Sequence, residues 1–146
     1  MRSISQAMGM KLKWFFTSMT EASINLFYED TDFRLKQVNK TKAWINNVIS
    51  KNNFRNEQLN YIVCSDVFLL DINRLYLQHD FYTDIITFPL SEEEGLLEAD
   101  IYISIDRVRE NAQLAKTSLQ NELHRVMIHG VLHLMGYKDS SDSQKK

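Results

Sequence analysis

The chain has 146 residues, and its 17 basic and 19 acidic side chains give a formal net charge of −2 at pH 7, which argues against a protein that coats nucleic acid by charge alone. The single cysteine, Cys64, excludes an intramolecular disulfide and a cysteine-rich metal site, and we expect it to be buried. No apolar run approaches the length of a membrane span, so we expect a cytoplasmic protein with no membrane partner.

The length predicts one domain, over residues 21–140. Residues 1–20 include several methionines, and we expect them to be either a disordered N-terminal extension or the product of a mis-assigned start. Residues 141–146 are expected to form a polar C-terminal tail. The function is therefore sought in the central domain.

Hydrophobic periodicity predicts strands that alternate with helices. In chain order we expect a strand over 23–28, a helix over 36–51, a strand over 60–68, a short helix over 69–78, and strands over 83–88 and 99–104. Asp106 is the predicted N-cap of a helix that runs to about Leu114, and Ser118 opens the last helix, which ends near Gly136. This order predicts an α+β fold of the α/β type, a single small mixed sheet with helices packed on it and the last helix in the core.

The last helix carries two histidines four residues apart, His129 and His133. On an α-helix this spacing places both imidazoles on one face, about 6 Å apart along the axis, so that one ion can bridge them. Gly136 is typical of the left-handed residue that ends a helix, and a turn there can return Asp139 toward the same ion. Two imidazoles and one carboxylate, with a fourth position left for water, are typical of a catalytic zinc, so the motif indicates hydrolysis.

Other interpretations of this helix stay open. Histidines four residues apart also occur as hydrogen-bonded core residues of an apolar helix. Zinc proteases place a glutamate base directly after the first histidine, whereas this chain has Gly130. A glycine there suits a bulky polymer substrate near the ion as well as it suits close packing of the helix, and the sequence does not decide between the two.

Several segments resemble the YbeY family, bacterial endoribonucleases that act as rRNA maturation factors. The run from His129 to Tyr137 resembles the family signature, and Leu70 to Tyr76 is similar to the family's helix LNxxY. Thr83-Asp84-Ile-Ile-Thr-Phe88-Pro89 resembles the stretch TDVLSFP, and Ala99-Asp100-Ile-Tyr-Ile-Ser104 resembles the strand GDIxIS. The segments follow the family order over roughly residues 60–140.

The resemblance implies a metal-dependent endoribonuclease that cleaves single-stranded RNA, matures the 3′ end of 16S rRNA and takes part in ribosome assembly and quality control. It implies one Zn²⁺ per chain, held by His129, His133 and Asp139. The implied partners are single-stranded rRNA, the small ribosomal subunit, ribosomal proteins and assembly GTPases. Two alternatives are a non-catalytic assembly factor with a structural metal and a zincin-type protease, which Gly130 opposes.

The chain departs from the family pattern at two positions. Asp139 stands where the family commonly has its third histidine ligand, a place that a carboxylate can take. Leu77 stands where the family usually has an arginine, which is suited to hold a phosphate in a bidentate contact. Arg74, His79 and Lys138 are our candidates for the residue that supplies this positive charge, and hence further candidate catalytic residues.

Two remaining features are expected to be ordinary surface. Basic residues gather around the start of the helix over 36–51, namely Arg34, Lys36, Lys40 and Lys42. His124 lies five residues before His129, about 140° round the helix from it, so we expect it not to share the ion.

Overall fold

The computed structural model describes residues 23–137. Its elements are β1 (Ser23–Glu29), α2 (Val38–Lys51), β2 (Arg55–Cys64), α3 (Asp66–Ile72), the π-helix η1 (Asn73–Leu77), β3 (Ile85–Pro89), β4 (Leu96–Ser104), α4 (Ile105–Ala115) and α5 (Leu119–Leu134). The order of strands and α-helices is the predicted one, and η1 continues α3. The predicted N-terminal extension and C-terminal tail lie outside the described residues. Between residues 23 and 137, no helix is long and apolar enough to cross a membrane.

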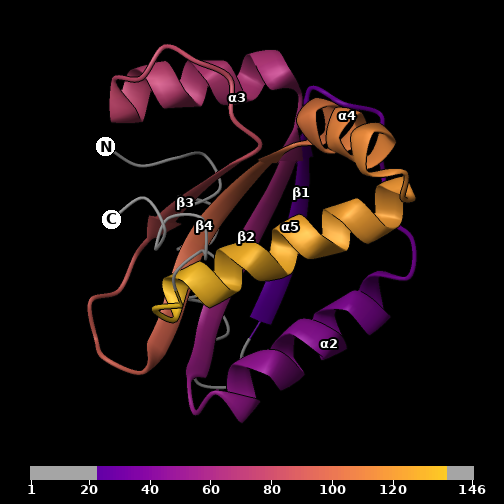
Figure 1. The fold of residues 1–146 in the computed structure, drawn as a ribbon. Coiled ribbons are helices and arrows are strands. Elements are labelled where there is room, and N and C mark those ends of the chain that lie inside the picture. The colour runs from indigo at the N-terminus through magenta and orange to yellow at the C-terminus, as the bar shows by residue number, and fades with distance from the viewer. Residues whose placement is uncertain (1–22, 138–146) are drawn as a thin grey trace.

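The strands form one sheet in the order β1-β2-β4-β3 (Figure 1). The first three neighbours are parallel, and the edge strand β3 runs antiparallel to β4. The sheet is therefore mixed, as predicted. The antiparallel pairing sets Ile85 opposite Ile103 and Phe88 opposite Asp100, so the two strand segments that resemble the YbeY family are direct neighbours.

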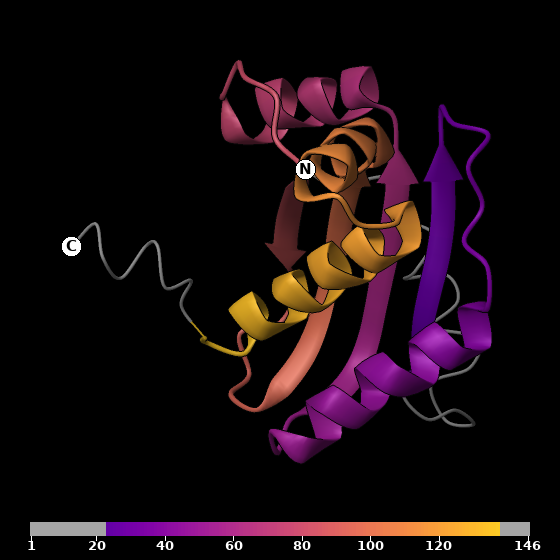
Figure 2. The same cartoon turned by 45° about the vertical axis from the view of Figure 1, so that its right-hand side comes forward.

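Side chains alternate between the two faces of the sheet, and each face has its own apolar cluster. On the first face Leu59, Tyr61 and Ile101 are fully buried beneath α2, α4 and α5. On the second face Ile62 and Tyr102 pack with residues of α3. Helices α2 and α5 lie side by side on the first face, as both ribbon views show (Figures 1 and 2). The helix that carries the histidines thus has a sheet below it and a second helix beside it.

The predicted strand over 60–68 is wrong at both ends, because β2 begins earlier and ends at Cys64. The Ser65 hydroxyl oxygen accepts a hydrogen bond from the backbone N–H of Phe68, with 3.1 Å between the heavy atoms, and so caps α3. This cap draws the apolar residues that follow it into a helix although their β-propensity favours a strand. The short helix predicted over 69–78 accordingly begins at Asp66.

Two further boundaries differ from the prediction. Ser104, not Asp106, caps α4, because its hydroxyl oxygen accepts from the backbone N–H of Arg107 at 3.2 Å. Strand β4 begins at Leu96, since the pairing with β2 extends beyond the segment that its sequence alone marks as a strand. The first difference comes from a contact with the first turn of the helix, and the second comes from pairing with a distant strand. Neither changes the order of the elements.

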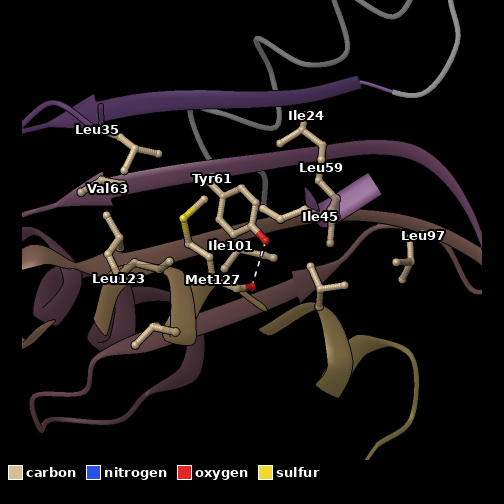
Figure 3. Packing of buried hydrophobic residues seen from close by; sticks show 14 of the residues in the cluster. Ile24, Leu35, Ile45, Leu59, Tyr61, Val63, Leu97, Ile101, Leu123 and Met127 are labelled. Atoms are coloured by element: carbon tan, nitrogen blue, oxygen red, sulfur yellow. Dashed lines mark hydrogen bonds between the residues drawn. The ribbon is translucent and has the colours of Figure 1, made fainter. Parts of the chain in front are cut away.

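Tyr61, on the central strand β2, connects the sheet to α5 by a hydrogen bond (Figure 3). Its buried hydroxyl donates a hydrogen bond to the backbone carbonyl of Met127, with 2.9 Å between the oxygens. Burial raises the pKa of Tyr61 well above its ordinary value, so the hydroxyl remains a donor at neutral pH. Because Met127 comes two residues before His129, this bond helps to fix the part of the helix that carries the histidines. Cys64 on the same strand is buried, as predicted.

Candidate functional site

Helix α5 turns its apolar side to the sheet and leaves His129 and His133 at the border of the core. It starts after Ser118, whose hydroxyl oxygen accepts from the backbone N–H of Asn121 at 3.0 Å, so the predicted start is confirmed. Its buried positions are Glu122, Leu123, Val126, Met127, Gly130 and Val131. His129 is half-buried and His133 is exposed. One side of the helix is therefore core, as predicted, and the histidines remain within reach of solvent.

Gly130 is a packing residue. A methyl group placed on it would lie 2.9 Å from Cδ1 of Ile85 and 3.6 Å from Cγ2 of both Ile101 and Thr87. Its position therefore faces β3 and β4, which decides between the two interpretations that the sequence left open. A glutamate at this place would point into the sheet rather than toward an ion bound by the histidines. The geometry thus removes the base on which a zincin-type protease depends.

The end of α5 has the turn that Gly136 predicts. Gly136 has φ +99°, and its N–H donates to the carbonyl of His133 at 3.0 Å. The N–H of Tyr137 donates to the carbonyl of Leu132, also at 3.0 Å, which completes a Schellman motif. The Tyr137 hydroxyl then donates to Oδ1 of Asn52, just past the end of α2, at 2.5 Å. The chain therefore changes direction within three residues of His133.

The two histidines of α5 are the described part of the predicted zinc site. His129 and His133 are four residues apart on one helix, and neither is enclosed in the manner of a closed structural site. Within residues 23–137 no three His, Cys, Asp or Glu side chains come together as a metal-binding group. A third ligand must therefore come from elsewhere, and Asp139, the predicted one, lies outside the described residues. Imidazole is a common ligand of catalytic zinc, and a zinc ion held by the two histidines with Asp139 as third ligand stays a prediction.

Two of the three candidates for the missing positive charge, Arg74 and His79, lie in or just after η1. Arg74 is exposed and its Nε donates to Oδ1 of Asp80 at 2.5 Å. His79 is also exposed and stacks on Phe81, with ring centroids 5.1 Å apart. Leu77, which replaces the family arginine, keeps 38% of its surface exposed. Lys138 lies outside the described residues, so the assignment of the phosphate-binding residue stays a prediction.

The second face of the sheet carries a polar row that the sequence patterns did not indicate. The side-chain amide of Asn25 donates to Oδ1 of Asn60, and the amide of Asn60 donates to Oδ1 of Asp100, both at 3.0 Å. Asn60 and Asp100 are each 1% exposed. The available signal is a lone asparagine between Leu59 and Tyr61 in a strand that is otherwise apolar there. The row ties three strands together beside the segment that begins at residue 99.

Comparison with known proteins shows which family this chain is similar to. The family model described as Endoribonuclease YbeY matches residues 25–146. The chain is 50% identical over 128 residues to the Endoribonuclease YbeY of Cytophaga hutchinsonii, which covers 88% of this chain and 90% of that protein. It is 47% identical over 123 residues to the protein of the same name from Amoebophilus asiaticus, with 84% of each chain covered. The solution structure of TM1509 from Thermotoga maritima resembles the fold with a TM-score of 0.58 at 29% identity, over 77% of this chain and 73% of that one.

The fold is α+β, and its mixed sheet is covered by a helix with paired histidines. Together with these relatives, it defines a small hydrolase of the nuclease class. Within that class, the chain belongs to the YbeY endoribonuclease family.

Proposed function

We propose that this protein is a zinc-dependent, single-strand-specific endoribonuclease that matures the 3′ end of 16S rRNA and acts in ribosome assembly and quality control. Membership of the YbeY family supports the endoribonuclease role. The observation that carries the proposal is the pair His129 and His133, four residues apart at the solvent border of α5 and followed at once by a tight turn. The proposed setting is the cytoplasm, with the small ribosomal subunit, ribosomal proteins and assembly GTPases as partners.

The chain's own residues divide the work. His129 and His133 would hold one Zn²⁺ with Asp139, and the Gly136 turn suits the return of the chain toward the helix end. When bound, the zinc supplies Lewis-acid chemistry, which polarises a phosphoryl oxygen or lowers the pKa of a water. Gly130 lets α5 approach β3 closely, so the histidines sit on a fixed support. A two-His, one-carboxylate set leaves a position open, as hydrolysis requires.

A positively charged side chain is proposed to orient the RNA backbone. Arg74, His79 and Lys138 are the candidates for the phosphate contact that Leu77 cannot make. Arg74 already bonds to Asp80, so phosphate binding by Arg74 would exchange one anionic partner for another. Single substitutions of the three residues by alanine, compared at equal metal content, identify the substitute as the one that lowers cleavage.

The test is metal content by elemental mass spectrometry, with cleavage of single-stranded rRNA fragments assayed on the same samples. We expect about one zinc per chain in the wild type, lost together with cleavage in His133→Ala and in Asp139→Ala. Asp32→Ala, which removes an exposed carboxylate before α2, is the matched control and should keep both. Zinc retained in Asp139→Ala would show that another residue completes the site.

A second function is favoured by one observation. Leu77 offers an apolar, partly exposed surface where the family pattern has an arginine, which suits protein or RNA contact without catalysis. In that case the protein is a ribosome-assembly factor and its metal is structural. Zinc bound at one per chain with no cleavage of any rRNA fragment would favour this function over the nuclease.

A further inference from the structure

A groove lies between helices α2 and α5, away from the paired histidines. It has a volume of about 450 Å³, and its walls include Lys40, Thr41 and Trp44 from α2 and His124 and Arg125 from α5. The two helices are neighbours on the first face of the sheet in both views (Figures 1 and 2). The groove is therefore a surface feature built from two separate parts of the chain.

An aromatic pair with one ring from each helix lines the groove. The rings of Trp44 and His124 have centroids 5.7 Å apart, and Trp44 keeps 39% of its surface exposed. Nε2 of His124 and the Thr41 hydroxyl are 3.0 Å apart and share a hydrogen bond, which fixes the imidazole. Burial lowers the pKa of His124, so its ring is uncharged at neutral pH. The pair thus offers two aromatic rings at 57° to each other, of which the Trp44 ring is partly exposed and the His124 ring is held by its hydrogen bond.

Lys40 gives the groove a net positive charge although the whole chain carries a net −2. Helix α2 has three lysines and no acidic residue, and α5 has one arginine and one glutamate. That glutamate, Glu122, has a side chain only 5% exposed and accepts two hydrogen bonds from Arg125, at 3.0 and 2.6 Å. Its charge is therefore neutralised locally, while Lys40 is exposed at the groove. A polyanion with aromatic groups is complementary to this combination of charge and rings.

We propose that this groove binds a single-stranded stretch of RNA, with a base stacked on Trp44 and the neighbouring phosphate beside Lys40. The inference rests on the proposed function in so far as it takes the substrate to be RNA. Along the axis of α5, His124 precedes His129 by a rise of about 7.5 Å. RNA bound in the groove therefore contacts the same helix that carries the paired histidines. The groove acts as a second contact that selects unpaired RNA, because only an unstacked base can lie on the tryptophan ring.

The test is fluorescence anisotropy of the zinc-loaded full chain with a labelled 2′-O-methyl RNA of about 12 nucleotides, a length within the range that such grooves engage. The probe is checked by gel to be intact after the titration. We expect Trp44→Leu to weaken binding about tenfold, the loss typical of one stacked base. Lys40→Gln should weaken it about threefold and lower the salt slope by about one. Lys51→Gln, the same charge change at the far end of α2, is the control and should bind as the wild type does.

Three outcomes would overturn the proposal. They are wild-type affinity in both Trp44→Leu and Lys40→Gln, an equal loss in Lys51→Gln and Lys40→Gln, and duplex RNA bound as tightly as the single strand. Lys40→Gln lies at an exposed position, so the test holds even where Trp44→Leu disturbs folding. Cleavage of a tetranucleotide, which is too short to span both the groove and the paired histidines, is measured in parallel. If the groove substitutions weaken RNA binding but the wild type does not cleave the tetranucleotide, the proposed nuclease activity alone is refuted. If the wild type cleaves the tetranucleotide but the groove substitutions leave RNA binding unchanged, the groove proposal alone is refuted.

Discussion

The contact between Gly130 and Ile85 sets how closely α5 approaches the sheet, and Gly130→Ala perturbs it with one methyl group. Two effects oppose each other. Alanine in place of glycine within a helix stabilises by about 1 kcal/mol through backbone entropy. The new methyl would lie 2.9 Å from Cδ1 of Ile85, against about 3.5–4.0 Å for a relaxed carbon contact. Ile85 must therefore move its terminal methyl by roughly 0.5–1 Å.

The displaced atom is the far end of a flexible side chain, which limits the cost. An off-rotamer torsion costs of the order of 0.5–1.5 kcal/mol, so the two effects nearly cancel. We expect Gly130→Ala to change the free energy of unfolding by less than about 1 kcal/mol. Ile85→Val removes Cδ1 itself and costs about 0.5–1.5 kcal/mol in the wild type. In the Ile85→Val background, Gly130→Ala should stabilise by about 1 kcal/mol, because the clashing atom is gone.

The assay is urea unfolding of the wild type, the two single variants and the double variant, followed by far-UV circular dichroism. The four free energies give the coupling between the two positions directly, expected at about 0.5–1.5 kcal/mol in favour of the double variant. A full stabilisation by Gly130→Ala alone, with no coupling to position 85, would refute the close contact. It would also reopen the interpretation that the glycine leaves space for a substrate.

Three further predictions concern single contacts. Tyr61→Phe removes only the bond to the Met127 carbonyl and should lower the free energy of unfolding by about 1 kcal/mol in urea, and no change would argue against the bond. Gly136→Ala meets no atom within 4 Å but adopts φ +99°, so backbone strain alone should cost about 1–2 kcal/mol by the same assay, and a neutral result would contradict the left-handed turn. Burial and nearby carboxylates raise the pKa of Cys64 to about 12, so at pH 8 its thiol stays protonated and should react with Ellman's reagent only after unfolding, whereas rapid reaction of the folded protein would place it at the surface.

Local patterns predicted the elements whose signals lie within a few residues. The cap at Ser118 and the turn at Gly136 were both correct, because a side-chain cap and a left-handed glycine act on the turn beside them. The strand predicted over 60–68 was wrong because the prediction did not take a side-chain cap into account. There the cap at Ser65 outweighed the strand propensity of the residues that follow it.

The paired histidines belong to the features that the sequence by itself determined, because the spacing of His129 and His133 along a helix depends only on helical geometry. The element order, the burial of Cys64 and the family likewise follow from patterns along the chain. Only the tertiary structure decided that Gly130 faces the strands of the sheet. It alone brought Thr41 to His124 across 83 residues of sequence and so formed the groove. Such contacts depend on how helices settle on the sheet, a geometry that no local pattern encodes.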